Sequence, residues 1–148
     1  MNQVKLSFKA VSGDFDEFYQ SVYEMADRLK LSGTERFRFV LCISEAFTNA
    51  FVHGNKQDPS KVINVNFRWD ESTVQVDIED EGAGKADQID LEHATAVAAD
   101  QTGGRGIGFL KEYADRIKVE PRDEGGLRMS IYWKLGDNIP ISGNQASA

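Results

Sequence analysis

Three short blocks of this chain carry residue types that could bind a nucleotide, and they follow one another in the sequence. Each block alone has an ordinary structural explanation, as a helix face or a glycine turn. Together they predict one pocket that offers a carboxylate, an amide and free backbone N–H groups. The blocks are Glu45-Ala-Phe-Thr-Asn49-Ala-Phe-Val-His53, Asp80-Glu-Gly82-Ala-Gly84 and Thr102-Gly103-Gly104-Arg105-Gly106-Ile107-Gly108.

The first block falls on a helix predicted over residues 32–54, which opens with the capping-box sequence Ser-Gly-Thr-Glu. The helix is apolar nearly all round, so we expect it to be buried between a sheet and another helix. At about 100° per residue, Glu45, Asn49 and His53 lie within about 80° of one another. The polar side chains of such a stripe have three possible environments: they form hydrogen bonds within the protein, they reach solvent, or they line a ligand site.

The three polar side chains of this stripe suit different tasks. The amide oxygen of Asn49 is a suitable Mg²⁺ ligand, and its NH₂ group could still donate to a phosphate. Glu45 could take a proton from a hydroxyl group or a water near a γ-phosphate. We expect His53 to order the end of the helix rather than bind a metal.

The second block follows an alternating apolar run and predicts a turn at the end of a strand. The Asp80 carboxylate could accept the exocyclic amine of adenine, while Gly82 and Gly84 allow the base to approach closely. An ordinary Asp-Gly turn is the alternative. We interpret the neighbouring acidic residues as solvated charges: Asp77, Glu79 and Glu81.

The third block places glycines at the start of a helix predicted over residues 107–114. Backbone N–H groups freed there form an anion-binding site, which the helix dipole reinforces. Arg105 adds a positive charge that could meet phosphate. The spacing is neither the dinucleotide fingerprint nor a Walker loop.

The remaining pattern predicts one domain over residues 1–135 and a flexible tail over 136–148. Strands and helices are expected in the order βααββ, a lid, then αββ. This order indicates an α/β (α+β) two-layer sandwich, in which a mixed, mostly antiparallel sheet has about three helices on one face. The expected alternating strands are 4–10, 63–67, 74–78, 117–119 and 127–133, and the expected first helix is 15–29.

Composition narrows the class of protein. A net charge of −7 disfavours direct nucleic-acid binding, which needs clustered Lys and Arg. No run is long and apolar enough to span a membrane, and the first residues lack the features of a signal peptide. The single cysteine, Cys42, is expected to be a buried thiol, which fits a cytoplasmic protein.

The three blocks resemble the N box and the two glycine boxes of the GHKL ATPases, the Bergerat fold shared by gyrase B, MutL and histidine kinases. Residues 43–54 resemble most closely the N box of the anti-sigma factor serine-protein kinases. The resemblance covers about residues 4–135.

This resemblance implies specific roles. Glu45 would be the general base, Asn49 the Mg²⁺ ligand and Asp80 the adenine reader, with residues 85–103 as an ATP lid. The residues from Thr102 to Gly108 would lie by the phosphates of ATP. Family members form homodimers, and they phosphorylate an anti-anti-sigma (STAS-type) protein that competes with a sigma factor for them. The fold often places Thr directly after the glycine of the last hairpin; this chain has Leu127 there, and Ser130 is the candidate substitute.

Two other functions fit the same blocks. A non-catalytic module could hold ATP and switch partners without phosphorylating anything, although it would have no need of Glu45. The catalytic half of a histidine kinase is disfavoured because no dimerisation helices with a phosphoacceptor histidine precede the domain.

Overall fold

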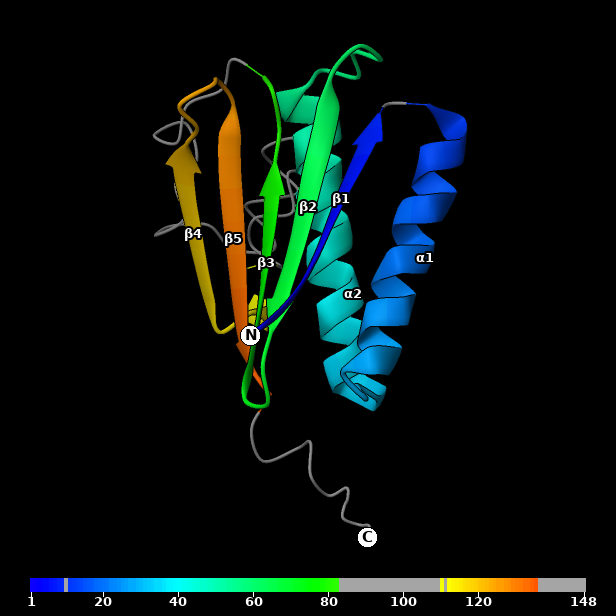
Figure 1. The fold of residues 1–148 in the computed structure, drawn as a ribbon, viewed down its shortest axis with the longest axis vertical. Helices are drawn as coiled ribbons and strands as arrows, with labels where there is room; N and C mark the ends of the chain where they lie inside the picture. Colours follow the sequence, from blue (N-terminus) through cyan, green and yellow to red (C-terminus); the bar gives the residue numbers. More distant parts are fainter. Residues whose placement is uncertain (10, 83–109, 111, 136–148) are drawn as a thin grey trace, which may run out of the picture.

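The computed structural model shows one sheet with helices packed against one of its faces (Figure 1). It describes residues 1–9, 11–82, 110 and 112–135. The strands are β1 (Asn2–Lys9), β2 (Val62–Trp69), β3 (Thr73–Glu79), β4 (Arg116–Pro121) and β5 (Leu127–Lys134). The helices are α1 (Ser12–Arg28), α2 (Gly33–Thr48) and the π-helical segment η1 (Asn49–Gly54).

The sheet order is β1-β2-β3-β5-β4, and every pairing among these described strands is antiparallel. The predicted two-layer α+β fold is confirmed, although the parallel pairing of a mixed sheet is not found in this part of the chain. The predicted hairpin between β2 and β3 is also confirmed. Its register pairs Val65 with Ile78 and Phe67 with Val76, so apolar residues of both strands share one face.

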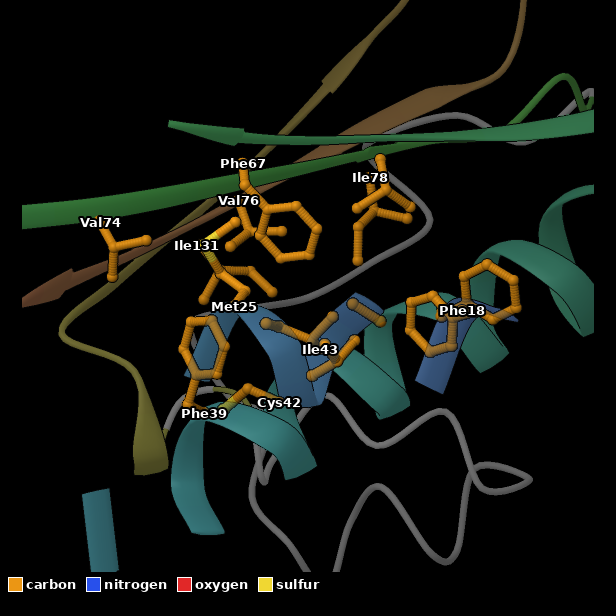
Figure 2. Close-up of a cluster of buried hydrophobic side chains, with 14 of the residues drawn as sticks. Phe18, Met25, Phe39, Cys42, Ile43, Phe67, Val74, Val76, Ile78 and Ile131 are labelled. Carbon is orange, nitrogen blue, oxygen red and sulfur yellow. The ribbon is translucent and has the colours of Figure 1, made fainter. Parts of the chain in front are cut away.

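That face of the sheet forms the core with the helices. Phe67, Val76 and Ile131 point from neighbouring strands toward Met25 and Ile43 on the helices (Figure 2). Rings from three elements, Phe8, Phe18 and Phe47, contact one another in the same core. This continuous apolar contact positions the helices on the sheet.

The two helices lie side by side over the sheet, but two expectations about the second helix were wrong. Phe37 on α2 is 60% exposed, so the helix has an outward face and is not buried all round. Ser32 occupies the N-cap position as predicted, yet its side chain makes no capping hydrogen bond. No helix of the described residues is long and apolar enough to cross a membrane.

The opposite face of the sheet is open and polar, and it forms a hollow lined by side chains of all five strands. Asp77, predicted to be solvated, is only 6% exposed there, and its carboxylate pairs with Arg68 at 2.6 Å. Glu79 pairs with Arg128, also at 2.6 Å. Ser130 lies on this face opposite Asp77, because it alternates with the core residues Met129 and Ile131. Ser130 therefore cannot replace the missing Thr.

Three predicted segments fall partly or wholly outside the described residues. Within the helix expected over 107–114, Leu110, Glu112 and Tyr113 are helical. The expected lid over 85–103 and the tail over 136–148 lie outside, so the division into a domain and a tail stays a prediction.

Candidate nucleotide site

Three segments far apart in sequence meet at one end of the sheet. The end of β3, the helical continuation of α2 and the turn between β4 and β5 all lie at the top of Figure 1, opposite the β2–β3 hairpin. Asp80 follows β3 at this end. It continues the alternation of the core residues Val74, Val76 and Ile78 and is only 6% exposed. A buried carboxylate in this position requires specific compensation.

Glycines from all three segments surround this aspartate. A Cβ atom at Gly54 would overlap the Asp80 carboxylate, and one at Gly126 would overlap the Asp80 carbonyl. A Cβ at Gly82 would overlap the carbonyl of Gly54. We call Gly54, Asp80, Gly82 and Gly126 the Asp80 cradle. Gly126 has a φ of +91°, a conformation that side chains other than glycine rarely adopt.

Backbone groups hold the Asp80 carboxylate in place. Its Oδ1 atom accepts hydrogen bonds from the N–H groups of Gly82 at 2.9 Å and Leu127 at 3.2 Å. The Asp80 N–H in turn donates to the Leu127 carbonyl at 3.0 Å. Burial raises the pKa of Asp80, whereas the two backbone hydrogen bonds and the charges of Arg122 and Lys61 act in the opposite direction.

The predicted polar stripe lies on the helix that ends in this cradle. The Asn49 N–H donates to the carbonyls of Ala46 and Glu45, so Glu45 and Asn49 are stacked one turn apart. The helix then widens, since the Asn55 N–H reaches the Ala50 carbonyl at 2.7 Å, an i→i−5 bond. Such π-helical turns are frequent at functional sites. Glu45 and His53 are both partly buried.

The Asn49 side chain has an unusual environment. Its Oδ1 and Nδ2 atoms are buried, and within the described part of the chain neither has a hydrogen-bond partner. An amide buried in this way is costly, because both its donor and its acceptor have lost water. A ligand that supplies a cation to the oxygen and a phosphate to the NH₂ group would remove this cost.

Asn55 is a site residue that the sequence analysis did not find. It is 2% exposed, and its Nδ2 donates to the Val62 carbonyl at 3.0 Å. Its Oδ1 accepts from the Glu81 N–H at 2.7 Å. Asn55 thus ties the end of η1 to the start of β2 and to the residue after Asp80. A Gly-Asn pair after a helix signals only a helix end, so its long-range role had no local signature.

The structure brings the first two predicted blocks together, since Gly54 contacts Asp80 and Asn55 binds Glu81. Gly84 and the whole third block lie outside the described residues. Their assignment to the phosphates therefore stays a prediction. Cys42 is buried in the core on α2, as predicted, and burial raises the pKa of its thiol to about 12.

Sequence comparison identifies the fold. The profile of the family described as "Histidine kinase-like ATPase domain" matches residues 10–133. This chain belongs to that family. The matched residues include the Asp80 cradle, and membership makes this chain an ATP-binding, kinase-type domain, in agreement with the resemblance seen in the three blocks.

Individual relatives share one name, anti-sigma F factor. The protein from Heyndrickxia coagulans is 29% identical over 87 residues, which are 57% of this chain and 59% of that relative. The protein from Halalkalibacterium halodurans is 27% identical over 120 residues, covering 80% of this chain and 82% of its own length. The protein from Geobacillus sp. strain WCH70 is 25% identical over 135 residues, which cover 90% of this chain and 91% of that relative.

Proposed function

We propose that this chain is an ATP-dependent serine-protein kinase that acts as an anti-sigma factor. It would phosphorylate an anti-anti-sigma protein of the STAS type and sequester a sigma factor. Membership in the ATPase family and relatives named anti-sigma F factor support this proposal. The observation that carries it is the buried Asn49 amide one helical turn from Glu45, on the helix that ends against Asp80.

Asp80 would read the adenine base. Its Oδ1 is held by the Gly82 and Leu127 N–H groups, which leaves Oδ2 as the atom we assign to the exocyclic amine. Leu127 stands where the fold often has Thr; its backbone N–H donates to Asp80, but its side chain cannot supply the hydroxyl contact that Thr would give. Gly82 and Gly84 would allow close approach of the base, and residues 102–108 would line the phosphates.

Asn49 would hold Mg²⁺ through its amide oxygen, and the buried amide without a described partner fits that group. When bound, Mg²⁺ neutralises charge on the phosphates of ATP. Glu45 would remove the proton from the substrate serine. The serine oxygen then bonds to the γ-phosphorus, the bond from that phosphorus to the β–γ bridging oxygen breaks, and ADP leaves with the electron pair.

We further propose a cytoplasmic homodimer that does not contact nucleic acid directly. The interface candidates change once the fold is known. Phe15 packs against Phe47 and Phe51, and Trp69 lies against the core beneath Arg28, so neither is a free aromatic anchor. The strand β1 remains a candidate because it is an edge of the sheet.

The proposal is tested by incubating the purified protein with γ-labelled ATP, Mg²⁺ and STAS-type proteins of its own genome. We expect label on a serine of one such protein. Glu45→Ala should retain ATP but transfer label about 10²–10⁴-fold more slowly, the usual range for loss of a general base. Glu35→Ala, at the other end of α2, is the matched control and should transfer at the wild-type rate.

The outcomes separate the two candidate functions. ATP binding without any transfer by the wild-type protein would favour the non-catalytic partner switch. Transfer by Glu45→Ala at the wild-type rate would remove Glu45 from the mechanism.

A further inference from the structure

Arg122 lies in the turn between β4 and β5, yet its side chain reaches into the nucleotide site. The guanidinium Nη1 donates to the Asp80 carbonyl at 2.5 Å and to the Gly125 carbonyl of its own turn at 3.4 Å. The side chain is only 9% exposed, although turn arginines usually extend into water. The shorter of these two hydrogen bonds is the one to Asp80, the residue after β3. The hydrogen bond within the turn therefore does not account for the placement of the Arg122 side chain.

The acidic neighbours of Arg122 do not explain its burial either. The closest approaches to Glu79 and Glu124 are both 3.8 Å, longer than a charge-assisted hydrogen bond. Glu79 already has a partner at 2.6 Å in Arg128. The Nε atom of Arg122 is buried, and no hydrogen-bond partner for it is found within residues 1–9, 11–82, 110 and 112–135. Burial of an arginine on such terms costs stability, which directs attention to what its remaining contact does.

The remaining contact completes the fixation of Asp80. The Asp80 N–H is held by the Leu127 carbonyl and its Oδ1 by two N–H groups, while Arg122 holds its carbonyl. The peptide group after Asp80 therefore cannot rotate without breaking the Arg122 bond. The carboxylate is held in one direction, and a positive charge nearby favours its ionised, acceptor-only form.

We infer that Arg122 is a positioning residue that fixes Asp80 as a rigid acceptor and thereby determines selectivity for adenine over guanine nucleotides. The inference rests on the proposed role of Asp80. Adenine presents an amine where guanine presents a carbonyl oxygen, so a fixed carboxylate attracts one base and repels the other. A carboxylate free to turn away would lose both the attraction and the repulsion.

The test is calorimetric titration of ADP and GDP into the wild-type protein, Arg122→Met and Arg122→Lys. We expect Arg122→Met to bind ADP about tenfold more weakly, the scale of one lost charge-assisted hydrogen bond, with GDP changed far less. Arg122→Lys keeps the charge without the planar fork and should recover only part of the selectivity. Arg128→Met is the matched control, because it removes an arginine that pairs with Glu79 and does not contact Asp80; its ADP-to-GDP ratio should equal that of the wild type.

A pH series adds a readout that a general loss of packing would not change. The charges that act on Asp80 are those of Arg122 in the turn and Lys61 before β2, with Glu79 and Glu81 as its chain neighbours and Glu124 beside Arg122. On acidification, the midpoint for loss of ADP binding should move to higher pH in Arg122→Met, because the positive charge that favours the ionised Asp80 carboxylate is lost. In Arg122→Lys it should stay near the wild-type midpoint.

Each outcome decides the inference. An unchanged ADP-to-GDP ratio in Arg122→Met, or an equal loss for both nucleotides with no shift in midpoint, would overturn it while the proposed function stands. A wild-type protein that binds no ADP would overturn the proposed function and this inference with it. If circular dichroism shows Arg122→Met to be unfolded, Arg122→Lys is the deciding variant. An ADP-to-GDP ratio equal to that of the wild type would contradict a role for the planar guanidinium group of Arg122. A reduced ratio would support that role.

Discussion

The two ends of β3 carry aspartates that look alike in sequence and differ in the structure. Asp70, in the hairpin before β3, accepts N–H bonds from Ser72 at 2.8 Å and Thr73 at 2.9 Å on its Oδ1 atom. Asp80, after β3, accepts two N–H bonds on the same atom, from Gly82 and Leu127. The hydrogen bonds lower the pKa of exposed Asp70, whereas burial raises the pKa of Asp80 despite a similar set of donors.

We interpret this difference as that between a structural aspartate and the proposed adenine reader. At Asp70 the carboxylate closes a turn and stays in water, so no further feature of the chain is needed. At Asp80 the charge is buried, and it is surrounded by three close glycines and a buried arginine. This arrangement carries a stability cost that a turn would not require. A bound adenine amine would compensate for that cost.

The largest effect is expected from Gly126→Ala. The new methyl group would overlap the Asp80 carbonyl in a backbone conformation that already disfavours a side chain. We expect the free energy of unfolding to fall by about 3–5 kcal/mol, measured by urea denaturation. Gly125→Ala is the control, because Gly125 has a φ of +103° and no atom lies within 4 Å of the position that its new methyl group would take. It should cost about 1–3 kcal/mol. Equal losses in the two variants would show that the contact with Asp80 is unimportant.

Two buried amides at the same end of the molecule sharpen the distinction. Asn55→Ala breaks the hydrogen bonds to Val62 and Glu81 and should lower the free energy of unfolding by about 2–3 kcal/mol. Asn49→Ala removes atoms that have no described partner, so stability should change by less than about 1 kcal/mol. Instead, Mg²⁺ should no longer tighten ATP binding, as followed in a magnesium titration. A magnesium dependence like that of the wild type would contradict the role given to Asn49.

Neutralising each aspartate in turn tests the comparison itself. Asp80→Asn should weaken ATP binding by about 1–3 kcal/mol, the scale of a lost charge-assisted hydrogen bond. Asp70→Asn should leave ATP affinity unchanged, and its only effect should be on the stability of the hairpin. Isothermal calorimetry with both variants measures this directly. Similar ATP affinities in the two variants would remove Asp80 as the adenine reader.

The smallest effect is a difference in pH dependence. The folded-state pKa of Asp80 is raised, so its contribution to stability is fully present below about pH 3.8 and is lost as the pH rises through the raised pKa. The pKa of Asp70 is lowered, so its contribution is present above about pH 3.8 and is lost as the pH falls through the lowered pKa. Asp80→Asn should therefore flatten the gain in stability on mild acidification. Unfolding curves that keep this gain in Asp80→Asn would assign it to another group.

Much of the fold could be predicted because local patterns determine it. Alternation at residues 63–67 and 74–78 predicted both strands of the hairpin, and their common face followed from it. The same rule could have corrected one error. Ser130 alternates with Met129 and Ile131, which places it on the open face and excludes it from the adenine site. The exposed face of α2 was missed because Phe37 is apolar, and hydropathy alone does not reveal which aromatic residues remain in water.

The long-range features of the site had no such local signal. The helix widens after Asn49, and its end at Gly54 meets Asp80, a contact between residues 26 positions apart. Arg122 stands in a Pro-Arg-Asp-Glu-Gly-Gly sequence that is typical of any solvated turn. Its hydrogen bond to Asp80 exists only because β5 pairs with both β3 and β4. Candidate reacting groups could be proposed from their residue types, whereas the residues that hold Asp80 in place could be found only from the fold.

The most direct test of the site is amide NMR of the protein titrated with ATP and Mg²⁺. We expect the largest shifts at the N–H groups of Gly54, Gly82 and Leu127, around the buried aspartate, and none at Ser72 and Thr73, around the exposed one. Shifts concentrated at the hairpin or on the open face of the sheet, with Gly82 and Leu127 unmoved, would contradict the assignment of the site.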